Sequence, residues 1–302
     1  MNKPITVLWY GGGQDSTAIL FKAVYDDAFK RQFIDGELIV VCSDTGNEFP
    51  ETYTYIHEVV EPFCKQHDIH FAHLTSDKGF HPKTWHSLQA QFERSNGIMS
   101  VAFPKTCTDN LKVKPCYNYL EYFLKKRYGF DSTKPKSAYY QYFEKFGKLK
   151  VLIGFGADET ERTGVNQQVK KDYSPVFVKK CIEKIYPLVR IGYNRFDCQD
   201  TIKRYGHIVP IPSNCMMCPF ASEQEIVYLY KAEPNAYAQW VTYESAKIAK
   251  DTLRGKVKNF GVKGSLTLTQ YTEKALLKYG HLSIEELYNH RFTHGHCVKS
   301  KY

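Results

Sequence analysis

The sequence predicts an α/β fold: a three-layer unit with a mostly parallel, doubly wound sheet, followed by a helical C-terminal appendage. Two observations support this prediction. In the first half, short β-branched apolar runs alternate with amphipathic segments, as in βαβ units. A cluster of glycines also separates the first apolar run from the first amphipathic segment, which is how a strand turns into a helix in such folds.

The expected elements of the first half follow one another in short steps. Residues 5–10 form the first apolar run, and a helix is expected over residues 16–30. A second strand at 37–42, a helix at 51–66 and a third strand at 69–74 complete the alternation. Continuous apolar runs of this length are typical of strands buried on both faces of a parallel sheet.

The alternation stops between residues 76 and 147, where His, Lys, Tyr and Phe are dense, and an insertion of helices and irregular structure is predicted. Strand character returns at 151–156 and more weakly at 185–189. We therefore expect an α/β domain over residues 1–190 and a mainly helical region over residues 191–302.

Composition restricts the class of protein. No run of eighteen apolar residues is present, so no membrane span is predicted. The apolar stretch near the N-terminus is too short for a signal peptide, and a cytoplasmic protein is expected. Nine cysteines, an odd number without the spacing of a secreted disulfide framework, indicate metal or redox chemistry in such a compartment.

Basic residues are concentrated between residues 105 and 150, where eleven Lys or Arg face four acidic residues and aromatic residues are interleaved. A surface of this kind can hold a phosphate backbone and stack bases, and Lys125, Lys126 and Arg127 are its densest part. The other interpretation is a solvated helix face above a tyrosine-rich core. Both interpretations remain open at the level of sequence.

The glycine cluster lies in the segment Tyr10–Thr17, Tyr-Gly-Gly-Gly-Gln-Asp-Ser-Thr. Glycines let the backbone turn tightly and bring N–H groups close to an anion, and Ser16 and Thr17 can add hydroxyl donors. The N-terminus of the following helix also favours negative charge. The segment therefore predicts a phosphate cradle at the carboxyl end of a parallel strand, with a ligand-free glycine turn as the alternative.

This segment resembles the SGGxDS signature of PP-loop ATP pyrophosphatases, with Gly11 at the position where that family usually has serine. The resemblance implies that ATP, with Mg²⁺, binds here. It also implies that ATP is cleaved between the α and β phosphates to activate a substrate by adenylation.

Three further segments resemble motifs of the PAPS-reductase-like branch of that superfamily, in the same order. Asp44–Thr52 is similar to DTGxxFPET, and Cys107–Pro115 is similar to CxxxxKVxP. Pro187-Leu188, followed by Asp197 and Asp200, is similar to the PL…D motif. The resemblance extends from about residue 7 to residue 220.

The resemblance implies which residues form the site. Asp15, Ser16 and Lys112 would be catalytic. The nucleotide-binding residues would be Gly11, Gly12, Gly13, Asp15, Ser16, Thr17, Asp44, Thr45, Gly46, Gly156 and Arg162.

Two departures separate the chain from the reductases. The segment Gly154–Glu159 lacks the arginine of the reductases' Gly-x-Arg stretch, and Arg162 is a candidate replacement. The reductases also carry a cysteine in a Glu-Cys-Gly-x-His pattern near the C-terminus, whereas this chain has His294-Gly-His296-Cys297.

The segment Cys215-Met-Met-Cys218 is a C-x-x-C that can present two thiolates to one metal centre. In cluster-bearing members of the family a Cys-Cys pair precedes the lysine segment; here Cys107 matches the first cysteine and Thr108 replaces the second. The resemblance implies a [4Fe–4S] cluster on Cys107 and the C-x-x-C pair, with one iron left open unless Cys116 or Cys297 is a fourth ligand. A structural Zn²⁺ site, a redox dithiol and a buried unliganded thiol at Cys116 are the alternatives.

Several histidines lie close together in the sequence, but they share no motif and are interpreted as polar loop and strand residues: His67, His70, His73, His81 and His86. His294 and His296 are weaker candidates for metal binding than the cysteines.

The motifs together imply ATP-dependent sulfur transfer. The single cysteine before the lysine segment, the C-x-x-C and the basic stretch look like those of relatives that thiolate nucleic acid, including DNA phosphorothioation enzymes, with a cysteine desulfurase as sulfur donor. One alternative is a sulfonucleotide reductase that acts on PAPS or APS with thioredoxin. Another is a catalytically silent nucleotide-binding module of a larger assembly, and a homodimer is also left open.

Overall fold

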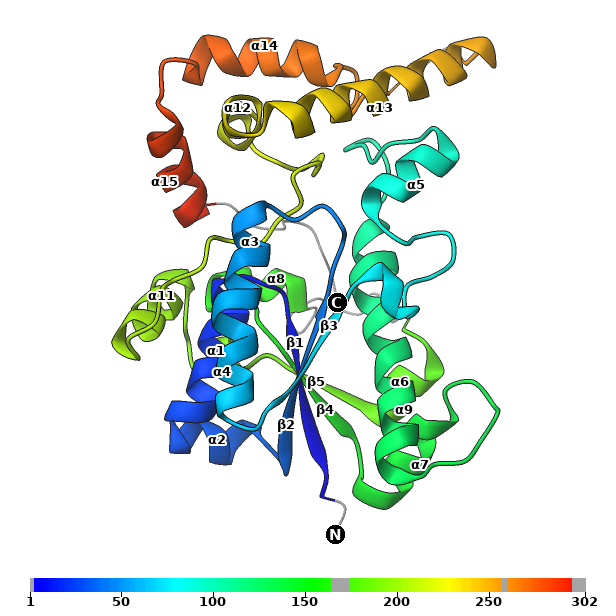
Figure 1. Cartoon of the computed structure of the whole chain (residues 1–302), viewed down its shortest axis with the longest axis vertical. Helices are drawn as coiled ribbons and strands as arrows, with labels where there is room; N and C mark the ends of the chain where they lie inside the picture. The colour runs from blue at the N-terminus through cyan, green and yellow to red at the C-terminus, as the bar shows by residue number, and fades with distance from the viewer. Residues whose placement is uncertain (1–2, 164–173, 257–259, 295–302) are drawn as a thin grey trace.

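The computed structural model describes residues 3–163, 174–256 and 260–294. Its sheet has five parallel strands in the order β3-β2-β1-β4-β5 (Figure 1). The strands are β1 Ile5–Tyr10, β2 Glu37–Ser43, β3 His70–Leu74, β4 Leu149–Ile153 and β5 Ile182–Ile185. The strand order reverses between β1 and β4, and helices cover both faces, so the predicted three-layer, doubly wound α/β fold is confirmed.

The strand expected at residues 185–189 is wrong. The fifth strand ends at Ile185, and residues Pro187–Arg190 form the short helix α10. Pro187 occupies the first helical turn, where a missing N–H costs nothing and a fixed φ favours helix.

One face of the sheet is covered by helices from the first third of the chain and by one later helix. They are α1 Gln14–Tyr25, α2 Asp27–Phe33, α3 Pro50–Tyr55, the π-helix η1 Ile56–Val60, α4 Glu61–Gln66 and α11 Arg195–Arg204. The single helix expected over residues 16–30 is two helices, because Asp26 has an extended backbone and its side chain accepts a hydrogen bond from the Phe29 N–H, which caps α2.

The other face is covered by α6 Lys114–Tyr128, α7 Ser137–Phe146 and α9 Val176–Cys181. The second half of the predicted insertion is therefore a layer of the fold. Tyr139 and Tyr142 are almost completely buried, and each hydroxyl donates to a backbone carbonyl, those of Tyr117 and Ile5. Aromatic residues that the sequence offers as a stacking surface are thus partly core residues with satisfied hydroxyl groups.

The C-terminal helices form a third core over the carboxyl ends of the strands (Figure 1). They are α12 Glu223–Ala232, α13 Pro234–Leu253, α14 Leu268–Tyr279 and α15 Ile284–His294. This core also contains side chains of α5 Leu88–Ser95 and of the π-helix η3 Asp109–Val113. The remaining short elements are η2 Ser76–Lys78, η4 Ala157–Glu159 and α8 Thr160–Thr163.

Within the described residues, no helix is both long enough and apolar enough to cross a membrane.

Candidate active site

A cavity opens at the carboxyl ends of β1 and β4, where the strand order reverses. Open α/β sheets bind ligands at this position. The space in this cavity that is open to the centres of water-sized molecules is about 110 Å³. Gly11, Gly13, Asp15 and Ser16 line it, as the glycine motif predicts.

The glycine loop is shaped as a cradle. Gly12 has a φ of 78°, a left-handed backbone conformation that glycine adopts readily and residues with a side chain rarely adopt. Gly13 is the N-cap of α1 and offers no side chain to its N–H groups, so the helix terminus stays available to a ligand. Ser16 Oγ accepts the Gly11 N–H at 3.2 Å and donates to the Gly13 carbonyl at 3.1 Å, which fixes the turn.

Three cationic side chains line the cavity: Lys112, Arg162 and Arg195. The one carboxylate among the lining residues is Asp15, whose Oδ1 is buried without a hydrogen-bond partner among the described residues. Burial raises the pKa of Asp15 to about 6, although the Arg195 charge opposes that shift. Lys112 and Arg162 are each held by an ion pair with a carboxylate behind the lining, Glu48 and Glu159. Ammonium and guanidinium groups beside a helix N-terminus can bind the oxygens of a polyphosphate.

Lys112 joins two of the predicted motifs. Its Nζ lies 3.1 Å from Oε1 of Glu48, and both side chains are largely buried. The same carboxylate accepts hydrogen bonds from the Thr45 hydroxyl at 3.1 Å and, more weakly, from the Ser213 hydroxyl at 3.4 Å. The lysine segment and the DTG-like segment therefore meet in one buried ion pair.

A second, smaller cavity lies on the other side of Lys112. Cys107, Cys215 and Cys218 line it, together with Lys105 and Lys112. The structure thus brings together three of the four predicted metal ligands, although about 110 residues separate the first from the pair.

The C-x-x-C loop is held by the DTG-like segment. The Met216 N–H donates to the Asn47 carbonyl, and the Met217 N–H donates to the Asn47 side-chain oxygen, both at 2.8 Å. An antiparallel bridge between Glu48 and Cys215 continues this contact. The position of Cys215 is therefore set by residues of a different motif.

The three thiols of this cavity are spaced more widely than the ligand atoms of a single metal ion. Among the described residues, only His57, Glu61 and His73 place three candidate ligand atoms within 4.8 Å of one another, so the three sulfur atoms are spread more widely. Thiolates on one zinc ion lie about 3.8 Å apart, given Zn–S bonds of about 2.3 Å. A cluster holds each thiolate on a different iron and accepts wider spacing.

Charge at the thiol cavity affects the pKa of Cys215. Burial raises the pKa of Cys215 well above its usual value, and the nearby Glu48 carboxylate adds to this shift while Lys112 opposes it. Its sulfur lies 3.7 Å from Glu48 Oε1. A cationic centre would favour the thiolate.

Cys116 does not belong to this group. Its side chain is buried in the core of the α6 face and borders the larger cavity, not the one lined by the other three thiols. Burial raises its pKa to about 12, as expected for a structural thiol. Cys297, the other predicted fourth ligand, lies outside the described residues.

Thr17 and the residues Asp44, Thr45 and Gly46, which the sequence predicts to bind the nucleotide, are not among those that line the larger cavity. The Thr17 hydroxyl is buried between the Tyr10 hydroxyl and the Gly13 carbonyl. The Asp44 carboxylate accepts the Gly46 N–H and a tyrosine hydroxyl, both at 2.8 Å, and so closes its own turn. These side chains shape the site rather than face a ligand, because local backbone donors and acceptors occupy their polar atoms.

Thr45 and Gly156 lie elsewhere. Thr45 lines the thiol cavity, where its hydroxyl contacts Glu48 and Cys215. Gly156 precedes η4 and is not among the residues that line the larger cavity.

The sequence does not predict three of the residues that line the larger cavity: Gly154, Arg195 and Ser213. A Cβ on Gly154 would lie 2.8 Å from the Ser16 backbone nitrogen, so glycine is needed where β4 approaches α1. Arg195 starts α11, next to the aspartates of the PL…D-like motif, and Ser213 packs against Gly13. Only their closeness to motifs could have indicated them.

One part of the basic stretch, around Lys125, Arg127 and Lys136, lies away from the candidate site. Arg127 forms an ion pair with Glu37, at the start of β2, and Lys125 and Lys136 pair with Glu121. This region is at the amino ends of the strands, opposite the glycine loop (Figure 1). Its charges are partly neutralised, which favours the interpretation as a solvated face there.

No protein-family model matches the chain, and no curated protein is significantly similar to it in sequence. Among solved structures, the chain is similar to U34-tRNA thiolase NcsA from Methanococcus maripaludis with its [4Fe–4S] cluster. The two share 12% sequence identity over 94% of this chain and 75% of that chain, with a TM-score of 0.38. A likeness this distant says nothing about substrate or reaction.

Proposed function

We propose that the protein binds ATP in the cavity beside the glycine loop, releases pyrophosphate and uses the activated intermediate for sulfur transfer to nucleic acid. The observation that carries this proposal is the position of Lys112, which pairs with the buried Glu48 and lines both the cationic cavity and the three-thiol cavity. Activation and sulfur chemistry would then take place on either side of one side chain.

The larger cavity supplies the groups that α–β cleavage requires. Backbone N–H groups of the glycine loop and the α1 N-terminus would hold phosphate oxygens, and Lys112, Arg162 and Arg195 would stabilise the charge that develops on pyrophosphate. Arg162 lies over the Phe155 ring, 4.1 Å from its centroid, which orients its guanidinium. The Asp15 carboxylate, with its buried Oδ1 lacking a partner among the described residues, fits the role of ligand for Mg²⁺ bound with the nucleotide.

The smaller cavity would hold a [4Fe–4S] cluster on Cys107, Cys215 and Cys218, which leaves one iron open to sulfur. Lys105 and Lys112 line the same cavity, and their charges would offset those of the thiolates. A cysteine desulfurase would supply the sulfur. The nucleic acid would approach from this side, because Lys105 lies at the thiol cavity whereas Lys125–Arg127 lie at the far end of the sheet.

The proposal is tested with anaerobically purified protein, ATP, sulfide and either tRNA or DNA. AMP and pyrophosphate should form in equal amounts, and sulfur should enter the nucleic acid. Cys215→Ser should lose iron and sulfur transfer, whereas Cys181→Ser, at a buried thiol on the sheet's other side, should keep both.

Two results would replace the proposal with one of its alternatives. Sulfite formed from PAPS or APS with thioredoxin would identify a reductase. ATP binding without pyrophosphate release, with every acceptor tried, would identify a silent module.

Lys105→Ala should weaken nucleic-acid binding and its salt dependence more than neutralisation of Lys125, Lys126 and Arg127 together.

A further inference from the structure

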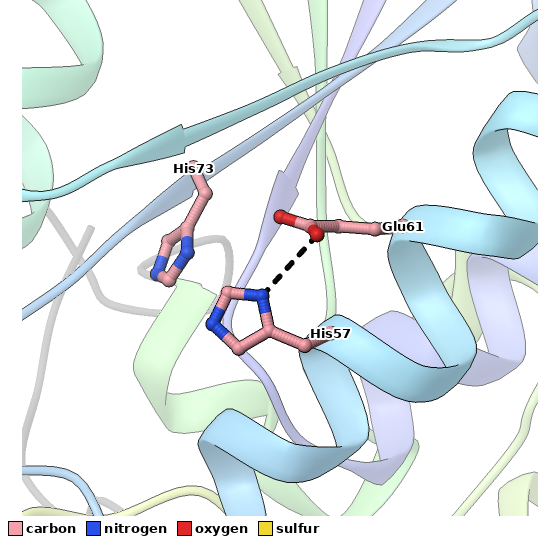
Figure 2. Close-up of side chains that lie close together, drawn as sticks. All are labelled: His57, Glu61 and His73. Carbon is pink, nitrogen blue, oxygen red and sulfur yellow. Dashed lines mark hydrogen bonds and ion pairs between the residues drawn. The ribbon is translucent and has the colours of Figure 1, made fainter.

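Two imidazoles and a carboxylate meet at the edge of the sheet, outside the candidate active site (Figure 2). His57 lies in η1, Glu61 begins α4 and His73 lies in β3, the edge strand. Each residue offers one ligand atom, and these atoms lie within 4.8 Å of one another. We propose that His57, Glu61 and His73 bind a zinc ion.

The local structure explains why these side chains converge. His57 and Glu61 are four residues apart on a continuous helical path, so both project from the same side, toward His73 on the neighbouring strand (Figure 2). The path contains a π-turn at residues 56–60, and such turns occur frequently at functional sites.

The spacing matches a metal site. Nδ1 of His57 lies 3.2 Å from Oε2 of Glu61. Ligand atoms on one tetrahedral zinc ion lie about 3.3 Å apart, given Zn–N and Zn–O bonds of about 2.0–2.1 Å. A hydrogen bond would explain this distance by itself, but it would not account for the third residue.

His73 supplies the independent observation. Its Nε2 is buried and has no hydrogen-bond partner among the described residues, while its ring centroid lies 5.6 Å from that of His57. A buried polar atom without a partner is unfavourable. Binding of the imidazole to a metal would give the ring a partner and fix its orientation. The nearby charges of Asp44 and Lys78 have opposite signs at His73. Together they therefore repel a cation bound at this imidazole only weakly.

The donor set selects the metal. Two imidazoles and one carboxylate are the ligands of zinc sites that keep a fourth position for water, whereas Ca²⁺ and Mg²⁺ prefer oxygen ligands throughout. The side chains of His57 and Glu61 are 55% and 41% exposed, so solvent can reach the fourth position. The ion would tie the helical layer to the edge strand, and this inference is independent of the proposed function.

Zinc can also bind thiols, so the test removes that competitor. Zinc is titrated against a chromophoric chelator in the full chain carrying Cys215→Ser and Cys218→Ser. One ion should bind, and His57→Ala, Glu61→Gln or His73→Ala should each weaken its affinity about tenfold or more. Glu58→Gln and His67→Ala, on the same helical path but outside the group, should leave it unchanged.

A second measurement keeps the proposal testable if the double serine variant does not fold. X-ray absorption of wild type loaded with zinc should show a component with nitrogen and oxygen ligands that His57→Ala removes. No zinc binding at micromolar concentration, equal binding by the triad variants and their controls, or sulfur-only ligation would each overturn the proposal.

Discussion

Glu48 is a buried carboxylate whose acceptor atoms face one cation and several weaker donors. Lys112 provides the cation, and the hydroxyls of Thr45 and Ser213 provide two of the donors. Removing one partner of a buried pair is far more costly than exchanging the pair for neutral groups, because an uncompensated charge then stays buried. The role of Lys112 in folding can therefore be separated from its role at the two cavities.

We expect Lys112→Ala to lower the free energy of unfolding by about 3–5 kcal/mol, as for other broken buried pairs. Lys114→Ala, on an exposed side chain of the next helix, should change it by less than about 0.5 kcal/mol. Urea denaturation measures both. Adding Glu48→Gln to Lys112→Ala should restore part of the stability, and no restoration would show that the pair is not the reason for the loss.

Asp15 gives the second prediction at this scale. Its pKa is raised from 3.8 to about 6 by burial, so the folded state binds a proton more tightly than the unfolded state. Stability should therefore fall as pH rises from about 4 to about 6. Asp15→Asn lacks this dependence and should be more stable than wild type at pH 7.5, by about 3 kcal/mol, yet nearly equal near pH 4. Equal stability at both pH values would contradict the assignment, whereas loss of ATP binding in this variant would agree with it.

At the scale of elements, the site depends on how closely β4 approaches the start of α1. Gly154 follows β4, and its Cα faces the backbone of Asp15 and Ser16 at a distance that leaves no room for a methyl group. Gly11, on the other side of the same loop, faces open space, since a Cβ there would meet nothing nearer than Ser16 Oγ at 4.0 Å. Position 154 therefore has no room for a side chain, whereas position 11 can accept a methyl group.

Gly154→Ala should destabilise the fold by about 1–3 kcal/mol, as other overpacking substitutions do. Gly11→Ala is the matched control and should cost less than about 0.5 kcal/mol. Thermal unfolding without ligand compares the two variants directly. Equal unfolding temperatures would mean that α1 can move away from β4 without cost.

At the scale of the whole molecule, polar contacts join the last of the C-terminal helices to segments next to the two cavities. Arg291 of α15 is almost completely buried, its guanidinium lies 3.4 Å from the centroid of the Phe49 ring, and it donates to the Asn214 side chain at 2.9 Å. Gln14 of the glycine loop also donates to the Phe292 carbonyl at 3.2 Å. The helical layer thus contacts the loop that precedes the C-x-x-C and a residue that lines the larger cavity.

Arg291→Ala should lower the free energy of unfolding by about 3–5 kcal/mol, because it creates a large void and removes the donor to Asn214. Arg254→Ala, at an exposed position after α13, is the control and should have little effect. Limited proteolysis should cut the α12–α15 layer of the Arg291 variant first. Digestion at the same rate as wild type would show that this layer does not depend on the arginine.

The sequence alone determined the features that depend on neighbouring residues. The apolar run at residues 5–10, the glycines after it and the amphipathic segment that follows predict a strand, a cradle and a helix, since each depends on local backbone preferences and periodicity. The alternation also predicts a parallel sheet. The boundary at Asp26 and the helix at Pro187 were missed because capping and proline effects shift element ends by a few residues.

Tertiary structure alone decided which distant residues share a site. Cys107 lies before α6 and lines the thiol cavity with the C-x-x-C pair. Cys116 lies in α6, only nine residues later, but its side chain is buried against the sheet. His73 meets His57 and Glu61 only because β3 lies beside the helix that precedes it, so no spacing in the sequence reveals the group. Local propensity acts over a few residues, whereas a site is assembled by burial of faces contributed by the whole chain.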